Sequence, residues 1–192
     1  MPTPDPESAL HWRVFPWDPG AAPGRPFSSS HITEGRGSGR FDLHAGALYL
    51  AESAEHALAE KIARYRGRSL GEHHLHESGR PLALVEVEIP TAWMERIADL
   101  CEPGVLAREG IRPDDTVARE RSVTQEIARR LHERDYVGLR WWSTFFGQWH
   151  VVVLFADRIE GERLRFLEPR PIGLDHPRLA SAAEAIGVRL PA

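Results

Sequence analysis

Four side chains in the sequence combine residue types that could do chemistry on a phosphorylated, ring-bearing molecule. Arg40 ends the glycine-rich stretch "GRGSGR", where glycine lets the backbone approach closely and an arginine can bind two phosphate oxygens. Tyr49 follows in an apolar run and offers a ring for stacking on a flat heterocycle. Glu60 adds one carboxylate, and Ser143 adds a hydroxyl among tryptophans and phenylalanines. These groups together supply an anion contact, a stacking surface and two polar groups.

Each of these residues also has a purely structural interpretation. A loop arginine such as Arg40 is, taken alone, more often solvated or ion-paired than bound to a ligand. Tyr49 could simply pack in the core, and Glu60 could be a solvated residue facing Arg64 one helical turn later. The Ser143 hydroxyl must either bond to the backbone or line a pocket. The single residues do not decide between the two interpretations.

Alternating and helical patterns predict the elements that would position these groups. We expect strands at "WRVF", "ALYLAE", "LALVEVEI", "GLRWWS", "WHVVVLF" and "RLRFLEP", and helices over 53–65, 91–100, 115–134 and 179–186. Ser53 has the side chain of a helix N-cap. A polar, glycine-punctuated loop over 27–42 carries Arg40. Strands that alternate irregularly with helices predict a mixed α/β domain.

Length and composition suit one soluble domain. The chain has 192 residues, of which 42% are hydrophobic and 27% charged, and the proline- and glycine-rich residues 1–26 read as an extended N-terminal arm. No apolar run approaches the roughly 20 residues that a membrane-spanning helix needs. The lone Cys101 and the lack of a signal-like start predict a cytoplasmic protein. A net charge of -4 argues against direct binding to nucleic acid.

Taken together, the motifs resemble the RES domain family. The resemblance rests on "GRF" with Arg40, on "LYLAESAEHALAE" ending at Glu60 and on "GLRWWS" ending at Ser143, and it spans about Arg13 to Phe155. It implies a single RES domain over 1–192 with an α/β (α+β) fold similar to ADP-ribosyltransferases, in which split small β-sheets with flanking helices clasp NAD. By the same resemblance, Arg40, Tyr49, Glu60 and Ser143 match the family's catalytic positions, and Arg40, Tyr49 and Ser143 would also contact NAD.

The resemblance further implies a toxin of a type II toxin–antitoxin system that degrades NAD. It would cleave the nicotinamide–ribose bond by hydrolysis or by phosphorolysis. Two alternatives stay open, namely transfer of ADP-ribose to a macromolecule and a non-catalytic NAD-binding module of the same fold. The implied partner is an antitoxin with a helix-turn-helix region, for which the aromatic run Trp141 to Phe146 and the arm before Phe27 are candidate docking surfaces. Homo-oligomer formation stays open.

The chemistry of NAD is consistent with such a sparse set of groups. Nicotinamide carries a positive charge in NAD and leaves as a neutral base, so its departure needs no general acid. A single Glu60 can therefore stabilise the oxocarbenium-like transition state, whereas ordinary glycoside hydrolysis uses two carboxylates. NAD would be the substrate, and no metal is expected. A metal site at His73, His74 and His76 is a weak alternative, because this run reads as a loop.

Overall fold

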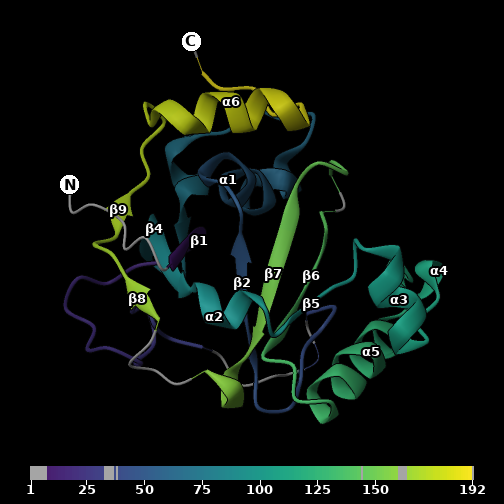
Figure 1. Ribbon diagram of the computed structural model, residues 1–192. Coiled ribbons are helices and arrows are strands. Elements are labelled where there is room, and N and C mark those ends of the chain that lie inside the picture. Colours follow the sequence, from purple (N-terminus) through teal and green to yellow (C-terminus); the bar gives the residue numbers. More distant parts are fainter. Residues whose placement is uncertain (1–7, 33–36, 38, 144, 160–163, 192) are drawn as a thin grey trace. The chain divides into compact units, whose positions relative to one another are not determined.

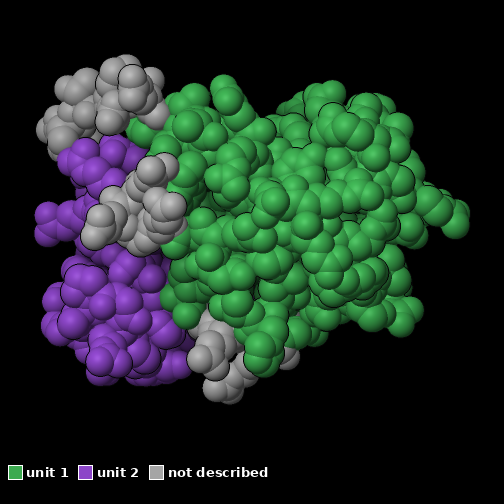
Figure 2. Space-filling model, turned by 60° about the horizontal axis from the view of Figure 1, so that its bottom comes forward, with its two compact units in different colours: residues 1–9, 32–50, 89–164 green, residues 10–31, 51–88, 165–192 purple. Residues whose placement is uncertain are grey.

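The computed structural model describes residues 8–32, 37, 39–143, 145–159 and 164–191. The chain divides into two compact units, each built from three separate segments. Unit 1 contains residues 1–9, 32–50 and 89–164, and unit 2 contains residues 10–31, 51–88 and 165–192 (Figure 2). Arg40, Tyr49 and Ser143 therefore belong to unit 1, and Glu60 belongs to unit 2.

Unit 1 is built on the strands β2 (Ala47–Ala51), β7 (His150–Phe155), β6 (Gly138–Trp142) and β5 (Ile97–Asp99), in that spatial order. Only the last residue of β2, Ala51, falls in unit 2. The hairpin of β6 and β7 is antiparallel and pairs Gly138 with Leu154, while β5 runs parallel to β6. A parallel pair needs a long connection, and the helices between β5 and β6 provide it.

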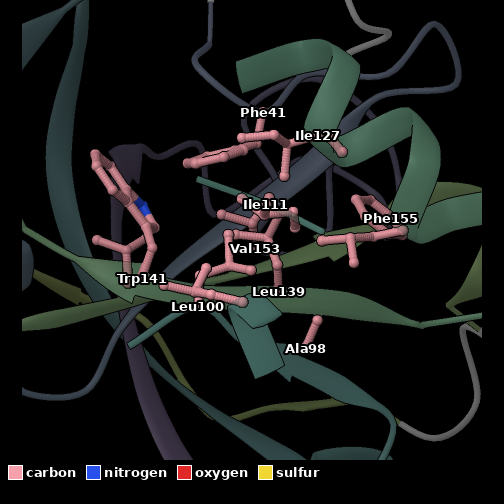
Figure 3. Close-up of a cluster of buried hydrophobic side chains, with 13 residues drawn as sticks. Phe41, Ala98, Leu100, Ile111, Ile127, Leu139, Trp141, Val153 and Phe155 are labelled. Atoms are coloured by element: carbon pink, nitrogen blue, oxygen red, sulfur yellow. The ribbon is translucent and has the colours of Figure 1, made fainter. Parts of the chain in front are cut away.

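These connecting helices cover one face of the unit 1 strands. They are α3 (Pro103–Glu109), α4 (Pro113–Thr116) and α5 (Arg121–Glu133), and they lie together beside β5 and β6 (Figure 1). The short α2 (Thr91–Met94) precedes β5, and a 3₁₀ turn (Ala156–Arg158) follows β7. Figure 3 shows the hydrophobic cluster between helix and strands, to which Phe41, Leu100, Ile127, Leu139, Trp141, Val153 and Phe155 contribute. Phe41 anchors the Arg40 loop in this core.

Unit 2 combines the long strands β1 (Ser8–Pro16) and β4 (Arg80–Pro90) with two helices, α1 (Ala54–Ile62) and α6 (Pro177–Ile186). The ends Ser8–Ala9 and Ile89–Pro90 of these strands lie in unit 1. The short strands β3 (His76–Glu77), β8 (Arg165–Phe166) and β9 (Arg170–Pro171) all pair antiparallel with β4. Two 3₁₀ turns, Ala63–Tyr65 and Glu72–Leu75, complete the unit.

Helix α1, which carries Glu60, has a well-defined start and a buried face. The Ser53 hydroxyl accepts a hydrogen bond from the His56 N–H at 3.1 Å, so the predicted N-cap is confirmed. Leu58 and Ile62 are buried, and α1 and α6 lie side by side (Figure 1). Their packing fixes the helix from which Glu60 projects.

The predicted mixed α/β fold is confirmed, but several predicted elements differ from those of the structure. The helix expected over 91–100 is wrong, because α2 ends at Met94 and residues 97–99 form strand β5. The helix expected over 115–134 is interrupted, since α4 ends at Thr116 and α5 begins at Arg121. Helix α3 is not among the predicted helices, although its proline at the first turn and Gly110 in a left-handed C-cap are ordinary helix boundaries.

Among the described residues, no helix is both long enough and apolar enough to cross a membrane. The arm predicted over 1–26 contains strand β1, which is longer than the expected "WRVF". The single RES domain over 1–192 stays a prediction.

Candidate functional site

Arg40 lies at the centre of a dense group of contacts in unit 1. Its Nη2 donates hydrogen bonds to the carbonyl oxygens of Thr116 at 3.2 Å and Ala118 at 2.8 Å. The guanidinium carbon lies 4.8 Å from the centre of the Trp141 ring, a distance typical of a cation–π contact. Trp141 in turn packs edge-on against Phe41. The arginine is thus held in place by neutral groups.

The charge of Arg40 has no acidic partner among the residues that the structure describes. Among these residues no carboxylate acts on its charge, and its Nε is buried without a hydrogen-bond acceptor there. Burial lowers the pKa of Arg40, and the nearby positive charge of Arg121 lowers it further. A guanidinium nevertheless stays protonated in proteins. A partly buried cation with an unpaired donor and no counter-ion among the described residues is suited to binding an anion.

Tyr49 braces the loop that carries Arg40. Its hydroxyl accepts the Phe41 N–H at 3.0 Å and donates to Asp42 Oδ1 at 3.0 Å. The second oxygen of Asp42 accepts the Gly39 N–H at 2.7 Å. Burial raises the pKa of Tyr49, so the hydroxyl keeps the proton that it donates. The side chain that was predicted to stack on a heterocycle therefore has a second task, which is to hold the backbone on either side of Arg40.

Gly39 and helix α5 complete this support. A Cβ at Gly39 would clash with Asp42 Oδ1 and the Tyr49 hydroxyl, so a larger residue would displace the two side chains that brace the loop. From α5, Gln125 Nε2 donates to the Gly39 carbonyl at 2.9 Å, and the Thr124 hydroxyl donates to the Arg40 carbonyl. Helix and strand together fix the loop backbone, which pre-positions the guanidinium.

Replacement of Tyr49 by phenylalanine separates its two roles. Tyr49→Phe keeps the ring but leaves the Phe41 N–H and the Asp42 carboxylate without their shared partner. We expect the free energy of unfolding to fall by about 1–3 kcal/mol, the usual cost of leaving partly buried polar groups unpaired. Urea unfolding of the purified variant measures this, with Tyr65→Phe in unit 2 as the control. Unchanged stability would show that the hydroxyl does not brace the loop.

Glu60 projects from α1 of unit 2, and its side chain is 39% exposed. The neighbouring His56, one turn earlier, is 1% exposed and places Nε2 3.2 Å from Glu60 Oε1. Arg64, the expected partner on the same helix, instead forms an ion pair with Glu77 at 3.2 Å. The carboxylate is therefore accessible to solvent and tied to a buried imidazole.

Ser143 is buried directly after β6. Its N–H donates to the Trp149 carbonyl at 2.7 Å, and its hydroxyl accepts the Phe145 N–H at 3.2 Å. The backbone bond that the sequence allowed for this hydroxyl is thus present. Trp141, which was expected to lie on an exposed aromatic docking surface, is only 5% exposed and belongs to the core, whereas Phe146 is 38% exposed.

The histidine run at 73–76 is more ordered than expected. It forms a 3₁₀ turn rather than a loop, and His74 Nδ1 accepts the Gly71 N–H at 2.8 Å. The rings of His73 and His74 lie 3.8 Å apart, and Tyr65 packs on His74 at 4.2 Å. These contacts give the run a structural explanation in the packing of unit 2.

Of the four predicted site residues, the structure links Arg40 and Tyr49, because Tyr49 of β2 braces the loop that carries Arg40. Ser143 is in the same unit, two residues after the tryptophan that contacts Arg40. Glu60 is in unit 2, and its convergence with Arg40 stays a prediction. The sequence analysis missed His56 and the role of Trp141. The spacing of His56 and Glu60, one helical turn apart, was a usable signal for the first of these.

Comparisons with known proteins agree with the motifs. The family model of the RES domain matches residues 11–174. Among solved structures, the chain is similar to one in the M. tuberculosis MbcT–MbcA toxin–antitoxin complex, with a TM-score of 0.60 and 17% sequence identity over 93% of this chain and 88% of that chain. No curated protein sequence matches. The structural likeness concerns the fold, while the family match covers most of the sequence, so this chain belongs to the RES domain family.

Proposed function

We propose that this RES domain protein is an NAD-degrading toxin that cleaves the bond between nicotinamide and ribose. The observation that carries the proposal is Arg40, a partly buried cation that has no carboxylate partner among the described residues and keeps a buried Nε without an acceptor there. A pyrophosphate supplies the anionic oxygens that such a group binds. The family match and the toxin–antitoxin complex of the structural relative support the same reading.

In the proposed reaction, the C–N bond of the nicotinamide ribose breaks and its electron pair goes to the ring nitrogen, which loses its positive charge. Positive charge then develops on the ribose, where the Glu60 carboxylate stabilises it and binds a ribose hydroxyl. Oxygen of water or of inorganic phosphate attacks the ribose carbon, and the released proton goes to solvent. Arg40 holds the pyrophosphate throughout, so its contact is similar in the ground state and the transition state.

Tyr49 and Ser143 have supporting roles in this proposal. Tyr49 keeps Arg40 in position through the Phe41 and Asp42 hydrogen bonds and presents its ring to the nicotinamide or the adjacent ribose. Ser143 orients the carboxamide of nicotinamide or the Glu60 carboxylate. NAD is the substrate, and the reaction needs no metal.

We further propose that a cognate antitoxin controls the enzyme in the cytoplasm. An unrestrained NAD-degrading enzyme would poison its own cell, and a toxin–antitoxin pair solves this problem by occupying the toxin. The antitoxin would carry a helix-turn-helix region, so that contact with DNA runs through the partner. The exposed Phe146, whose ring packs against Trp149 at 4.7 Å, is a candidate anchor for that partner.

Incubation of the purified protein with NAD tests the function directly. Free nicotinamide with ADP-ribose indicates hydrolysis, and a phosphorylated ADP-ribose formed only with added phosphate indicates phosphorolysis. Label from NAD on protein would instead indicate transfer to a macromolecule. Absence of any turnover would leave a non-catalytic NAD-binding module as the better account.

Expression of the chain alone in bacteria tests the toxin role. Growth should stop, and intracellular NAD should fall before the cells lose viability. Normal growth and normal NAD in cells that contain soluble, folded protein would contradict the toxin assignment.

A further inference from the structure

A buried histidine contacts the proposed catalytic carboxylate. His56 is 1% exposed, and its Nε2 lies 3.2 Å from Glu60 Oε1. An ionised carboxylate can only accept hydrogen bonds, so Nε2 must carry the proton and donate it. We propose that His56 is a positioning residue that fixes the orientation of Glu60 for attack on NAD; this inference rests on the proposed NAD cleavage.

The ring of His56 is well placed to act as a fixed support. The backbone N–H of His56 donates to the Ser53 hydroxyl at 3.1 Å, in the first turn of α1. The same turn is tied to α6 by the ion pair of Glu55 with Arg178 at 2.6 Å. Because the backbone of His56 is held and only 1% of its side chain is exposed, the imidazole has little room to turn.

Glu60 has the opposite character and therefore gains from the contact. A long carboxylate side chain that is 39% exposed on a helix would by itself sample several rotamers. The hydrogen bond from His56 selects rotamers that keep Oε1 beside the imidazole. The entropy cost of ordering the Glu60 side chain is then met during folding and not in the transition state. A charge that is already oriented stabilises developing positive charge most effectively.

A purely structural role for His56 would have a different signature. Loss of a buried ring would lower stability, and any effect on activity would follow the amount of folded enzyme. A positioning role instead lowers kcat while leaving KM for NAD nearly unchanged, since the pyrophosphate contact at Arg40 supplies ground-state binding. It also requires that a side chain with a donor at the same position restores activity.

Three variants of His56 make this distinction. His56→Leu removes the donor, His56→Asn keeps a polar amide that is too short to reach Oε1, and His56→Gln places an amide N–H close to the position of Nε2. We expect the leucine and asparagine variants to lose roughly tenfold to a hundredfold in kcat, as misplaced catalytic groups do. The glutamine variant should recover most of that loss. Equal kcat in the asparagine and glutamine variants would overturn the proposal, even if the leucine variant fails to fold.

Leu179→Ala is the matched control, because Leu179 is buried on α6, the helix that packs against α1, and makes none of the contacts that hold His56 or Glu60 in this proposal. It should lower the thermal unfolding temperature and leave kcat of the folded enzyme unchanged. If Leu179→Ala lowered kcat as much as His56→Asn does, the loss would reflect the stability of the helix packing and the positioning role would be wrong.

A readout that does not depend on turnover separates this inference from the proposed function. Three-bond NMR couplings report the χ1 and χ2 populations of Glu60. We expect one dominant rotamer in the wild type and averaged rotamers in His56→Asn. If the wild type cleaves NAD but the rotamers of Glu60 are averaged, the positioning role of His56 is wrong and the proposed NAD cleavage stands. A single rotamer that depends on His56, in a protein that does not cleave NAD, would refute the proposed function while the contact stands.

Discussion

Glu60→Gln is expected to lower the turnover of NAD by a factor on the order of 10² or more, the usual loss when an electrostatic contact to a transition state is removed. The substitution keeps the size of the side chain and removes only the negative charge that opposes the developing charge on the ribose. Because the side chain is 39% exposed, the fold should persist. NAD affinity should change little, since Arg40 supplies the ground-state contact. Steady-state release of nicotinamide and calorimetric binding of NAD measure the two quantities.

Glu72→Gln is the matched control for this experiment. Glu72 is exposed in the same unit as Glu60, at the start of the 3₁₀ turn Glu72–Leu75, and it has no proposed contact with substrate. Its variant should turn over NAD at the wild-type rate. Wild-type activity in Glu60→Gln would remove Glu60 from the reaction, and a large loss of NAD affinity in that variant would assign the carboxylate a binding role instead.

The strands near the site were predictable because their signals are local. The alternation in "LALVEVEI" and the apolar run "WHVVVLF" correspond to β4 and β7, and Ser53 caps α1 as its side chain suggested. Such patterns depend on neighbours in sequence, so a single chain contains them. The helix predicted over 91–100 was wrong because part of this segment depends on a partner that is distant in the sequence. Residues 97–99 are a strand because they pair with β6, and that partner lies some forty residues later.

The chemistry of the site was predictable only in part, because its supports come from distant segments. The sequence placed Arg40 in a glycine-rich loop but gave no indication that carbonyls at 116 and 118 and the ring of Trp141 would surround it. The sequence likewise gave no indication that the Tyr49 hydroxyl would form hydrogen bonds with Phe41 and Asp42, because these bonds require the loop to fold back on β2. The sequence also did not show which rings of the run Trp141 to Phe146 are buried, because an aromatic run looks the same in a core and on a surface; Trp141 is 5% exposed and Phe146 is 38% exposed.

Arg40→Ala is expected to weaken binding of NAD and of ADP-ribose by about tenfold or more, because charge-assisted hydrogen bonds to the pyrophosphate are lost. The turnover number at saturating NAD should fall much less, since the contact is made in the ground state and the transition state alike. Binding of ADP-ribose by calorimetry and steady-state kinetics at several NAD concentrations measure both effects. Affinity in the wild type should also fall with added salt, and this dependence should be shallower in the variant.

The control for Arg40→Ala must separate loss of the anion contact from loss of a structural brace. Arg96 is suitable, because its Nη2 also donates to a backbone carbonyl of unit 1, that of Asp135 at 3.1 Å, but its side chain is exposed. Both variants lose such a bond, and both should show a lower unfolding temperature. Only Arg40→Ala should lose affinity for ADP-ribose. If the two variants bind ADP-ribose equally well, Arg40 merely ties residues 116–118 to the loop before β2, and the pyrophosphate of NAD must be held by other groups.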